Sequence, residues 1–176
     1  MLHQYPGTGR ADGANVNAAL TDDGSTALFF AAQRGHLETA RLLLDRGANV
    51  NAACTDDGAT ALIWAAIFGY LEIAHLLLDR GANVDAARTS DGATALMRAA
   101  VSGHLELACL LLDRGANVNA ARTVDGCTAL MYASLNGPLR LVRRLLELGA
   151  NKNAVDANGL KAERYASSTE IKSALE

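Results

Sequence analysis

The sequence has no apolar run long enough to cross a membrane, no excess of basic residues and few cysteines. A membrane-spanning helix needs roughly 20 consecutive apolar residues, and the longest runs here are far shorter. The formal charge is −3 and no basic stripe is present. Proteins that bind nucleic acid in general use lysine and arginine to displace counterions from phosphate. We therefore expect a chain that binds neither membranes nor nucleic acid.

The amino-terminal segment and the cysteines indicate where the protein works. Residues 1–12 are polar and lack the apolar centre of a secretion signal. A disulfide framework or a zinc site would need a planned spacing of cysteines. The three cysteines follow no C-x-x-C spacing and occupy different positions of a repeat described next: Cys54, Cys109 and Cys127. We interpret them as small apolar residues in a reducing compartment and predict a cytoplasmic protein without a metal site.

The chain does have a repeat of 34 residues. Because a repeat determines the whole fold, its units are defined before any single motif is interpreted. The stretch D-R-G-A-N and the pair Asp-Gly both recur at this interval. They define four full units, at residues 21–54, 55–88, 89–122 and 123–155. Residues 1–12 are a non-repeat segment, residues 13–20 are the tail of a partial unit, and residues 156–176 are a shortened unit that caps the carboxyl end.

Each unit predicts two short helices and an extended loop. In the first unit, Leu28 and Ala32 recur at helical spacing, Thr26 is placed to cap the helix start and Gly35 to end it. A second apolar stripe begins at Leu37, and the loop that follows alternates and ends in Asp-Gly, as hairpins do. Helices this short are not stable alone. Neighbouring units must therefore stack.

The repeated pattern D-G-x-T-A-L-x-x-A-A-x-x-G-H-L-E, followed by L-L-L-D-R-G-A-N-V-N-A-A, resembles the ankyrin repeat over residues 13–176. Four copies in register make the resemblance specific. It implies an all-α repeat solenoid, in which paired helices stack into a curved column and β-hairpin loops project from it. It also implies a function, because ankyrin proteins bind protein partners with the hairpin tips and the exposed side of the first helices.

The sequence departs from the ankyrin pattern in three ways. The usual T-P-L-H is T-A-L followed by an apolar residue, so its proline and histidine are missing. The repeat is 34 residues instead of 33, except for the fourth unit, which has 33, and the added residue predicts longer hairpin tips. The final unit has Glu163 beside Lys161 and Arg164, which suits a polar cap facing water. The extra residue of each hairpin is Leu20, Cys54, Arg88 or Arg122.

Catalysis is not expected. A nucleophile with its base and orienting acid would break the repeat at one place, and no such break occurs. His36 and His104 occupy the repeated G-H-L-E position, so the scaffold explains them. No P-loop and no G-x-G-x-x-G motif is present. We predict a protein that is not an enzyme and needs no cofactor.

Positions that change from unit to unit are the better candidates for recognition, because they carry no common stacking role. We therefore predict a protein–protein interaction module that binds a protein or peptide on its concave face and hairpin tips. The alternative is a structural spacer or consensus-like scaffold without a partner of its own, which the near identity of the second and third units favours. The candidate contact residues are Asp23, Gln33, Arg34, Asp57, Trp64, Ile67, Phe68, Arg88, Asp91, Arg98, Ser102, Arg122, Asp125, Tyr132 and Asn136.

Phe68 is the strongest of these candidates. It lies just before Gly69, where the other units have Arg34, Ser102 and Asn136, so the scaffold does not require an apolar residue there. Aromatic and arginine side chains are enriched among binding hot spots. For Trp64 and Tyr132 the alternative stays open that they only pack between helices.

Two further expectations concern the hairpins and the amino end. Hairpins of the form L-x-x-x-x-x-x-V-N in ankyrin proteins are often substrates of an asparaginyl hydroxylase, and the resemblance implies such sites at Asn51 and Asn119. The alternative is that these asparagines only brace the hairpin, since asparagine suits turns. The unit at 21–54 keeps residues such as Phe30 apolar although no helical unit precedes it. We expect residues 1–12 to cover that face, or two molecules to meet there as a homodimer.

Overall fold

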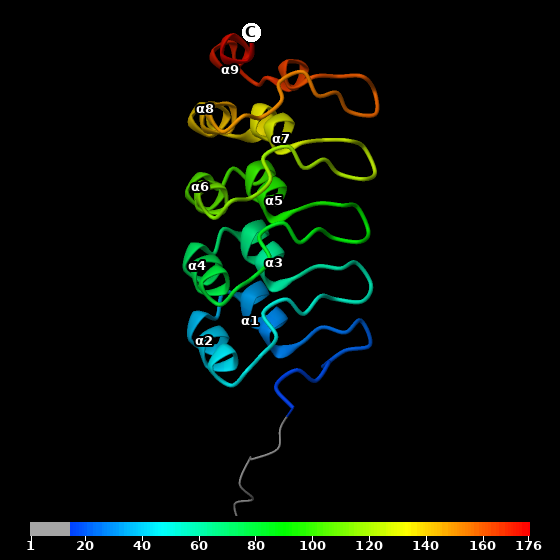
Figure 1. Ribbon diagram of the computed structural model, residues 1–176, viewed down its shortest axis with the longest axis vertical. Coiled ribbons are helices and arrows are strands. Elements are labelled where there is room, and N and C mark those ends of the chain that lie inside the picture. The colour runs from blue at the N-terminus through cyan, green and yellow to red at the C-terminus, as the bar shows by residue number, and fades with distance from the viewer. Residues whose placement is uncertain (1–14) are drawn as a thin grey trace, which may run out of the picture.

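Paired helices follow one another along a single column in the computed structural model, which describes residues 15–176 (Figure 1). The 3-10 turn η1 (Ala162–Tyr165) and the helix α9 (Thr169–Leu175) end the column. The predicted all-α repeat solenoid with projecting hairpin loops is confirmed. The four helix pairs are α1 (Ala27–Arg34) and α2 (Leu37–Asp45), α3 (Ala61–Phe68) and α4 (Leu71–Asp79), α5 (Ala95–Val101) and α6 (Leu105–Asp113), and α7 (Ala129–Asn136) and α8 (Leu139–Glu147).

The first helix of each unit begins at the threonine that the sequence indicates. The hydroxyl of Thr26 accepts a hydrogen bond from the backbone N–H of Phe29 at 3.4 Å, and Thr60, Thr94 and Thr128 cap their helices in the same way. This bond satisfies one of the N–H groups that a helix start leaves unpaired. Helix α1 ends at Gly35 with φ of 75°, the left-handed conformation expected there.

The core lies between the two helices of each unit and the units on either side. Leu77, Leu111 and Leu145, one from each of three successive second helices, are completely buried. The first helices contribute alanines such as Ala66 and Ala100, which are also completely buried. Their small side chains let α1, α3, α5 and α7 pack closely in that order. The packing between helices and between units therefore stabilises helices that are too short to be stable alone.

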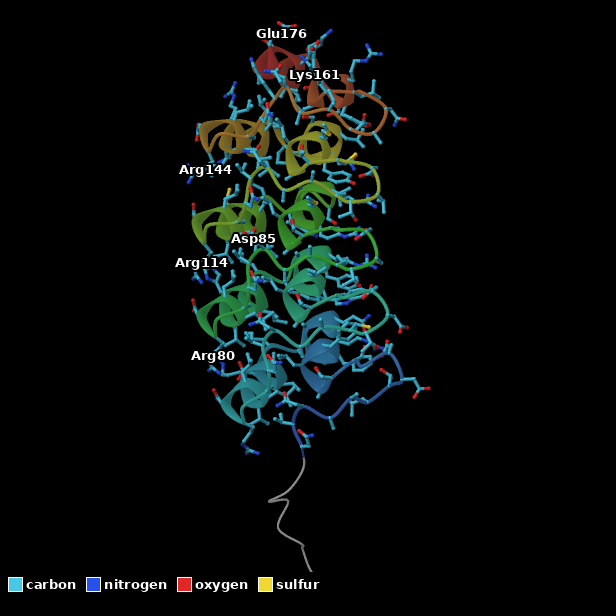
Figure 2. The ribbon with its side chains drawn as sticks, turned by 45° about the vertical axis from the view of Figure 1, so that its right-hand side comes forward. Arg80, Asp85, Arg114, Arg144, Lys161 and Glu176 are labelled. Carbon is cyan, nitrogen blue, oxygen red and sulfur yellow. The ribbon has the colours of Figure 1, made fainter. Side chains whose placement is uncertain are left out.

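Ion pairs join each second helix to the next. Arg80 Nη2 lies 2.7 Å from Asp45 Oδ1, Arg114 Nη2 lies 2.9 Å from Asp79 Oδ1, and Arg144 Nη2 lies 3.0 Å from Asp113 Oδ1. The three arginines follow one another along the second-helix side of the column (Figure 2). These side chains are between one third and two thirds exposed. Each pair therefore adds little stability by itself.

The hairpins are narrow loops closed by an isolated antiparallel bridge, such as the one between Ala53 and Thr60. The extra residue of the 34-residue unit follows the bridge directly, and the N–H of Cys54 donates to the carbonyl of Ala59 at 2.9 Å. Arg88 and Arg122 make the same backbone bond. The side chains of these three residues reach back to the preceding hairpin. The extra residue therefore contributes a contact between hairpins as well as length.

A row of amide side chains connects the loops behind the hairpins, and we call Asn17, Asn51, Asp85 and Asn119 the asparagine row. The Nδ2 of Asn51 donates to the carbonyl of Gly81 at 3.2 Å, while its Oδ1 accepts from the N–H of Asn83 at 2.7 Å. Asn17 and Asn119 make the equivalent pair of bonds. This geometry supports the bracing interpretation of Asn51 and Asn119. Their hydroxylation stays a prediction.

Asp85 interrupts the row, and we predict that Asp85→Asn stabilises the protein by about 1 kcal/mol, the net contribution of one hydrogen bond. The carboxylate of Asp85 accepts from the N–H of Asn117 at 2.8 Å, as an asparagine would. Its second oxygen cannot donate to the carbonyl of Gly115, whereas Asn51 and Asn119 do donate to the equivalent carbonyls. Chemical denaturation measures the effect. Asn119→Asp is the matched control and should lower stability, and a neutral result for both variants would contradict the prediction.

Apolar side chains are exposed at the amino end of the column. Leu20 is 61 % exposed and Leu42 is 51 % exposed, while Phe30 and Leu37 are half-buried. Residues 1–12, which we expected to cover this end, lie outside the described residues. The homodimer through this end also stays a prediction.

Candidate binding surface

The candidate contact residues lie on the hairpins and on the first helices. They form three groups along each unit: the hairpin turn, the middle of the first helix and the end of the first helix. The hairpin group is Asp23, Asp57, Asp91, Asp125, Arg88 and Arg122. The middle group is Trp64, Arg98 and Tyr132, and the end group is Gln33, Arg34, Ile67, Phe68, Ser102 and Asn136.

The hairpin aspartates are held in one orientation by their own backbone. The Oδ1 of Asp57 accepts from the N–H of Ala59 at 2.8 Å, and Asp91 accepts from Ala93 at 3.0 Å. Asp125 makes the same bond to the N–H of Cys127. Such turns are a common use of aspartate, whose side chain can bond to the backbone two residues ahead. The second oxygen of each carboxylate is therefore free to meet a neighbouring side chain.

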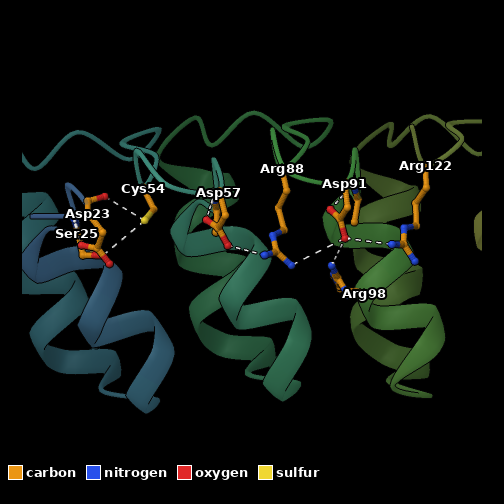
Figure 3. Close-up of polar contacts among 10 residues, drawn as sticks. Asp23, Ser25, Cys54, Asp57, Arg88, Asp91, Arg98 and Arg122 are labelled. Atoms are coloured by element: carbon orange, nitrogen blue, oxygen red, sulfur yellow. Dashed lines mark hydrogen bonds and ion pairs between the residues drawn. The ribbon is translucent and has the colours of Figure 1, made fainter. Parts of the chain in front are cut away.

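Arginines from adjacent hairpins and helices meet these carboxylates (Figure 3). Arg88 Nη2 lies 2.5 Å from Asp57 Oδ2, and Arg98 Nη2 lies 2.6 Å from Asp91 Oδ2. Arg122 lies 3.3 Å from both Asp91 and Asp125. We call these six residues, Asp57, Arg88, Asp91, Arg98, Arg122 and Asp125, the Asp–Arg network. It joins the second, third and fourth units.

Asp91 is the centre of the network. Burial raises the pKa of its carboxyl group, but the N–H of Ala93 and the guanidinium groups of Arg98, Arg88 and Arg122 together hold that pKa below the ordinary value. The side chain of Asp91 is 15 % exposed, and each arginine side chain is 22 % exposed. The network charges therefore neutralise one another inside the protein. Contact between these residues and a partner stays a prediction.

The middle of the first helix differs between units. Tyr132 accepts a hydrogen bond from Arg122 Nη1 at 2.5 Å, and this contact contributes most to the raised pKa of Arg122. Arg98 joins the network in the equivalent place of the third unit. The second unit has Trp64 there, whose buried Nε1 has no hydrogen-bond partner in residues 15–176. Trp64 and Tyr132 therefore both pack against buried residues, and their contact with a partner stays a prediction.

Aromatic rings form a continuous row on the first two units, and we call Phe29, Phe30, Trp64, Phe68 and Tyr70 the aromatic row. Phe29 contacts Phe30 and Trp64 edge to face, with ring centroids 5.4 Å and 5.6 Å apart. Trp64 stacks on Phe68 at 5.7 Å, and Phe68 stacks on Tyr70 at 5.8 Å. Phe68 is 45 % exposed. Phe68 therefore exposes part of an aromatic ring to solvent while it packs against Trp64 and Tyr70.

Sequence reasoning missed Tyr70. It occupies the place of His36 and His104 in the repeated G-H-L-E motif, and its ring lies against Gly35, where an added Cβ would come within 2.9 Å. The replacement of histidine by tyrosine at this one place was the available signal.

The other residues at the end of the first helix divide by exposure. Arg34, Ser102 and Asn136 are exposed. Gln33 and Ile67 are half-buried, and Ile67 packs against the core, so it adds less surface than Phe68. Leu135, which is 44 % exposed, is a further apolar residue on this side that sequence reasoning did not select.

Within residues 15–176, no group of three or more histidine, cysteine, aspartate or glutamate side chains is placed to hold a metal ion. Over the same range, no helix is both long and apolar enough to span a membrane. All three cysteines are free thiols.

Comparison with known families gives a match over most of the chain. The family described as ankyrin repeats (3 copies) matches residues 9–88 and again residues 84–156. A search of curated proteins finds no match.

Proposed function

Because the chain belongs to the ankyrin-repeat family, we propose that it binds a protein or peptide partner through the face formed by its hairpins and first helices. Ankyrin repeats are generally protein–protein interaction modules, and the family is typically non-enzymatic. The structural spacer without a partner is the competing proposal. The two proposals differ in whether the variable side chains of this face contact a partner.

The exposed ring of Phe68 is the observation that carries the proposal. Arg34 and Asn136 end their first helices at the equivalent place, and Ser102 is the C-cap of α5 there, so stacking does not require an apolar residue. The ring stacks on both Trp64 and Tyr70. A side chain that is ordered before binding loses little conformational freedom when it meets a partner. Exposed and supported aromatic residues are the usual anchors of interfaces.

We expect Phe68→Ala to weaken partner binding by about 1–3 kcal/mol, the range of binding hot spots. Partners are captured from a lysate on the immobilised chain and identified by mass spectrometry, and the affinity of a purified partner is then measured by calorimetry. The melting temperature should change little, because Phe68 is 45 % exposed.

Leu135→Ala is the matched control, because Leu135 is exposed to the same degree at the end of α7. It removes apolar surface without touching the aromatic row. If Phe68→Ala instead lowers stability by roughly 3–5 kcal/mol, as an emptied core site does, Phe68 belongs to the scaffold. Failure to capture any specific partner would favour the spacer.

A further inference from the structure

The repeat itself provides a template for a binding site at the first hairpin. In the later units, a hairpin aspartate accepts a backbone N–H with one oxygen and meets arginine with the other, as Asp57 does with Arg88 and Asp91 does with Arg122. In both pairs the arginine is the residue that follows the bridge of the next hairpin along the chain. Each pair joins residues 31 positions apart, and the pairs recur with the 34-residue repeat.

Asp23 has the same orientation but no arginine. Its Oδ1 accepts from the N–H of Ser25 at 3.0 Å and from the hydroxyl of Thr21. The place of Arg88 and Arg122 is occupied by Cys54, whose thiol donates to the carbonyl of Asp23 at 3.0 Å (Figure 3). Within residues 15–176, no cationic side chain forms an ion pair with Asp23. Asp23 is therefore the one hairpin aspartate of the four units whose carboxylate forms no ion pair with an arginine in this part of the chain.

Hydrogen bonds stabilise the charged form of the Asp23 carboxylate. The hydroxyl of Thr21 and the N–H of Ser25 are the main causes that hold its pKa below the ordinary value. Asp22 and Asp56, on the same pair of hairpins, are exposed and form no ion pair in residues 15–176. Asp22, Asp23 and Asp56 on these two hairpins therefore present negative charge, whereas the Asp–Arg network pairs Asp57, Asp91 and Asp125 with arginines.

Aromatic rings stand where the later units carry polar partners of the network. Phe30 and Trp64 occupy the helix position of Arg98 and Tyr132. In the third unit, Arg98 at this position reaches Asp91 at 2.6 Å, and in the fourth unit Tyr132 bonds directly to Arg122. A side chain at this position is thus within reach of both the hairpin carboxylate and its guanidinium partner. The face of an aromatic ring attracts a cation placed over it.

We propose that Asp23, Phe30 and Trp64 bind an arginine side chain of the partner, which fills the position that Arg88 and Arg122 fill in the later units. This inference rests on the proposed function and names the chemistry of its partner. A guanidinium group suits the site better than an ammonium group, because it is planar, pairs with a carboxylate through two N–H groups and stacks on aromatic rings.

The probe for this site is a peptide selected from a phage-displayed library of random dodecapeptides on the full chain. The selected peptides should contain arginine, and replacement of that arginine with uncharged citrulline should weaken binding about tenfold or more, as measured by fluorescence anisotropy. Asp23→Asn should cause a similar loss. Asp22→Asn is the matched control, because it removes the same charge from the adjacent residue, and it should change the affinity by less than about twofold. Equal losses for Asp22→Asn and Asp23→Asn, or full binding of the citrulline peptide, would overturn the proposal.

Cys54→Arg offers an independent test. It supplies the arginine from within the chain, so it should raise the melting temperature and abolish binding of the selected peptide. A folded Cys54→Arg variant that binds the peptide like the unchanged protein would overturn the proposal. Arg10→Ala controls for the chain's own arginine before the described residues, and a large gain in peptide affinity would assign the site to that residue instead of a partner.

The two proposals fail separately. If Phe68→Ala weakens partner capture while Asp23→Asn and citrulline have no effect, the arginine site is wrong and the proposed function stands. If the arginine peptide depends on Asp23 but no lysate partner depends on Phe68, the arginine site stands and the role of Phe68 is wrong.

Discussion

Asp91→Asn should lower the free energy of unfolding by about 2 kcal/mol at neutral pH. The asparagine keeps the hydrogen bond from the N–H of Ala93 but leaves Arg88, Arg98 and Arg122 without their shared carboxylate. Removing one partner of a fully buried ion pair costs roughly 3–5 kcal/mol. The loss here is smaller because the side chain of Asp91 is 15 % exposed, so water partly solvates the arginines. Urea denaturation measures it.

The pH dependence of this loss follows from the pKa of Asp91. Because the folded-state pKa is depressed below the ordinary value of 3.8, the unfolded chain takes up the proton first as the pH falls. The carboxylate therefore contributes its full stability above the unfolded-state pKa and loses it as the pH falls through the folded-state pKa. The stability curves of the unchanged protein and of Asp91→Asn should converge in this acidic range.

Asp56→Asn is the control for Asp91→Asn. Asp56 lies on a neighbouring hairpin, is exposed and forms no ion pair in residues 15–176. Its substitution should change stability by less than about 0.5 kcal/mol. If Asp91→Asn lowers the free energy of unfolding no more than Asp56→Asn does at any pH, the Asp–Arg network does not stabilise the fold.

Gly92→Ala should cost about 3 kcal/mol of stability for two added reasons. Gly92 has φ of 73°, a conformation that strains an alanine by roughly 1–2 kcal/mol. An added Cβ would also lie 2.6 Å from the backbone nitrogen of Thr123 in the next hairpin. Backbone cannot rotate away as a flexible side chain can, so the hairpins must separate, and overpacking of this kind costs roughly 1–3 kcal/mol. Thermal or urea denaturation reports the sum.

Gly115→Ala separates the two causes. Gly115 has φ of 83° but no atom within 4 Å of its added Cβ, so it carries the strain without the clash. It should cost only about 1–2 kcal/mol. If Gly92→Ala and Gly115→Ala lower stability equally, the close approach of the hairpins at Gly92 does not constrain the fold.

The architecture could be predicted because its signals are local and repeated. Thr26 and Gly35 mark the ends of α1 by their own chemistry. The threonine cap recurs in all four units, and left-handed glycines recur at Gly69 and Gly103. Gly137 is extended instead, as the residue before a proline usually is. Short helices with a single apolar stripe left stacking as the only stable arrangement. The pairing of helices then followed from the period.

The partners of individual side chains could not be predicted in the same way. Arg88 and Arg122 were selected as contact residues because they vary between units, yet both point back to aspartates of the preceding hairpin. A repeat shows which residues are equivalent but not which neighbour a long side chain reaches. The contacts of Tyr70 with Phe68 and Gly35 could likewise be seen only in the structure. Variation between units therefore marks internal contacts as readily as external ones.

The bonds between hairpins also determine how the chain can reach this structure. Thr55 donates to the carbonyl of Asp23, Thr89 to that of Asp57 and Thr123 to that of Asp91, so each hairpin bond spans 32 residues and links adjacent units. Contacts of this range need only short loops to close, which favours rapid folding. A folding nucleus can form from any adjacent pair of units and grow outward one unit at a time. Ion pairs tie the third unit to both neighbours, through Arg88 and Asp91 on one side and Arg122 and Asp125 on the other. We therefore expect growth to start at the middle of the column.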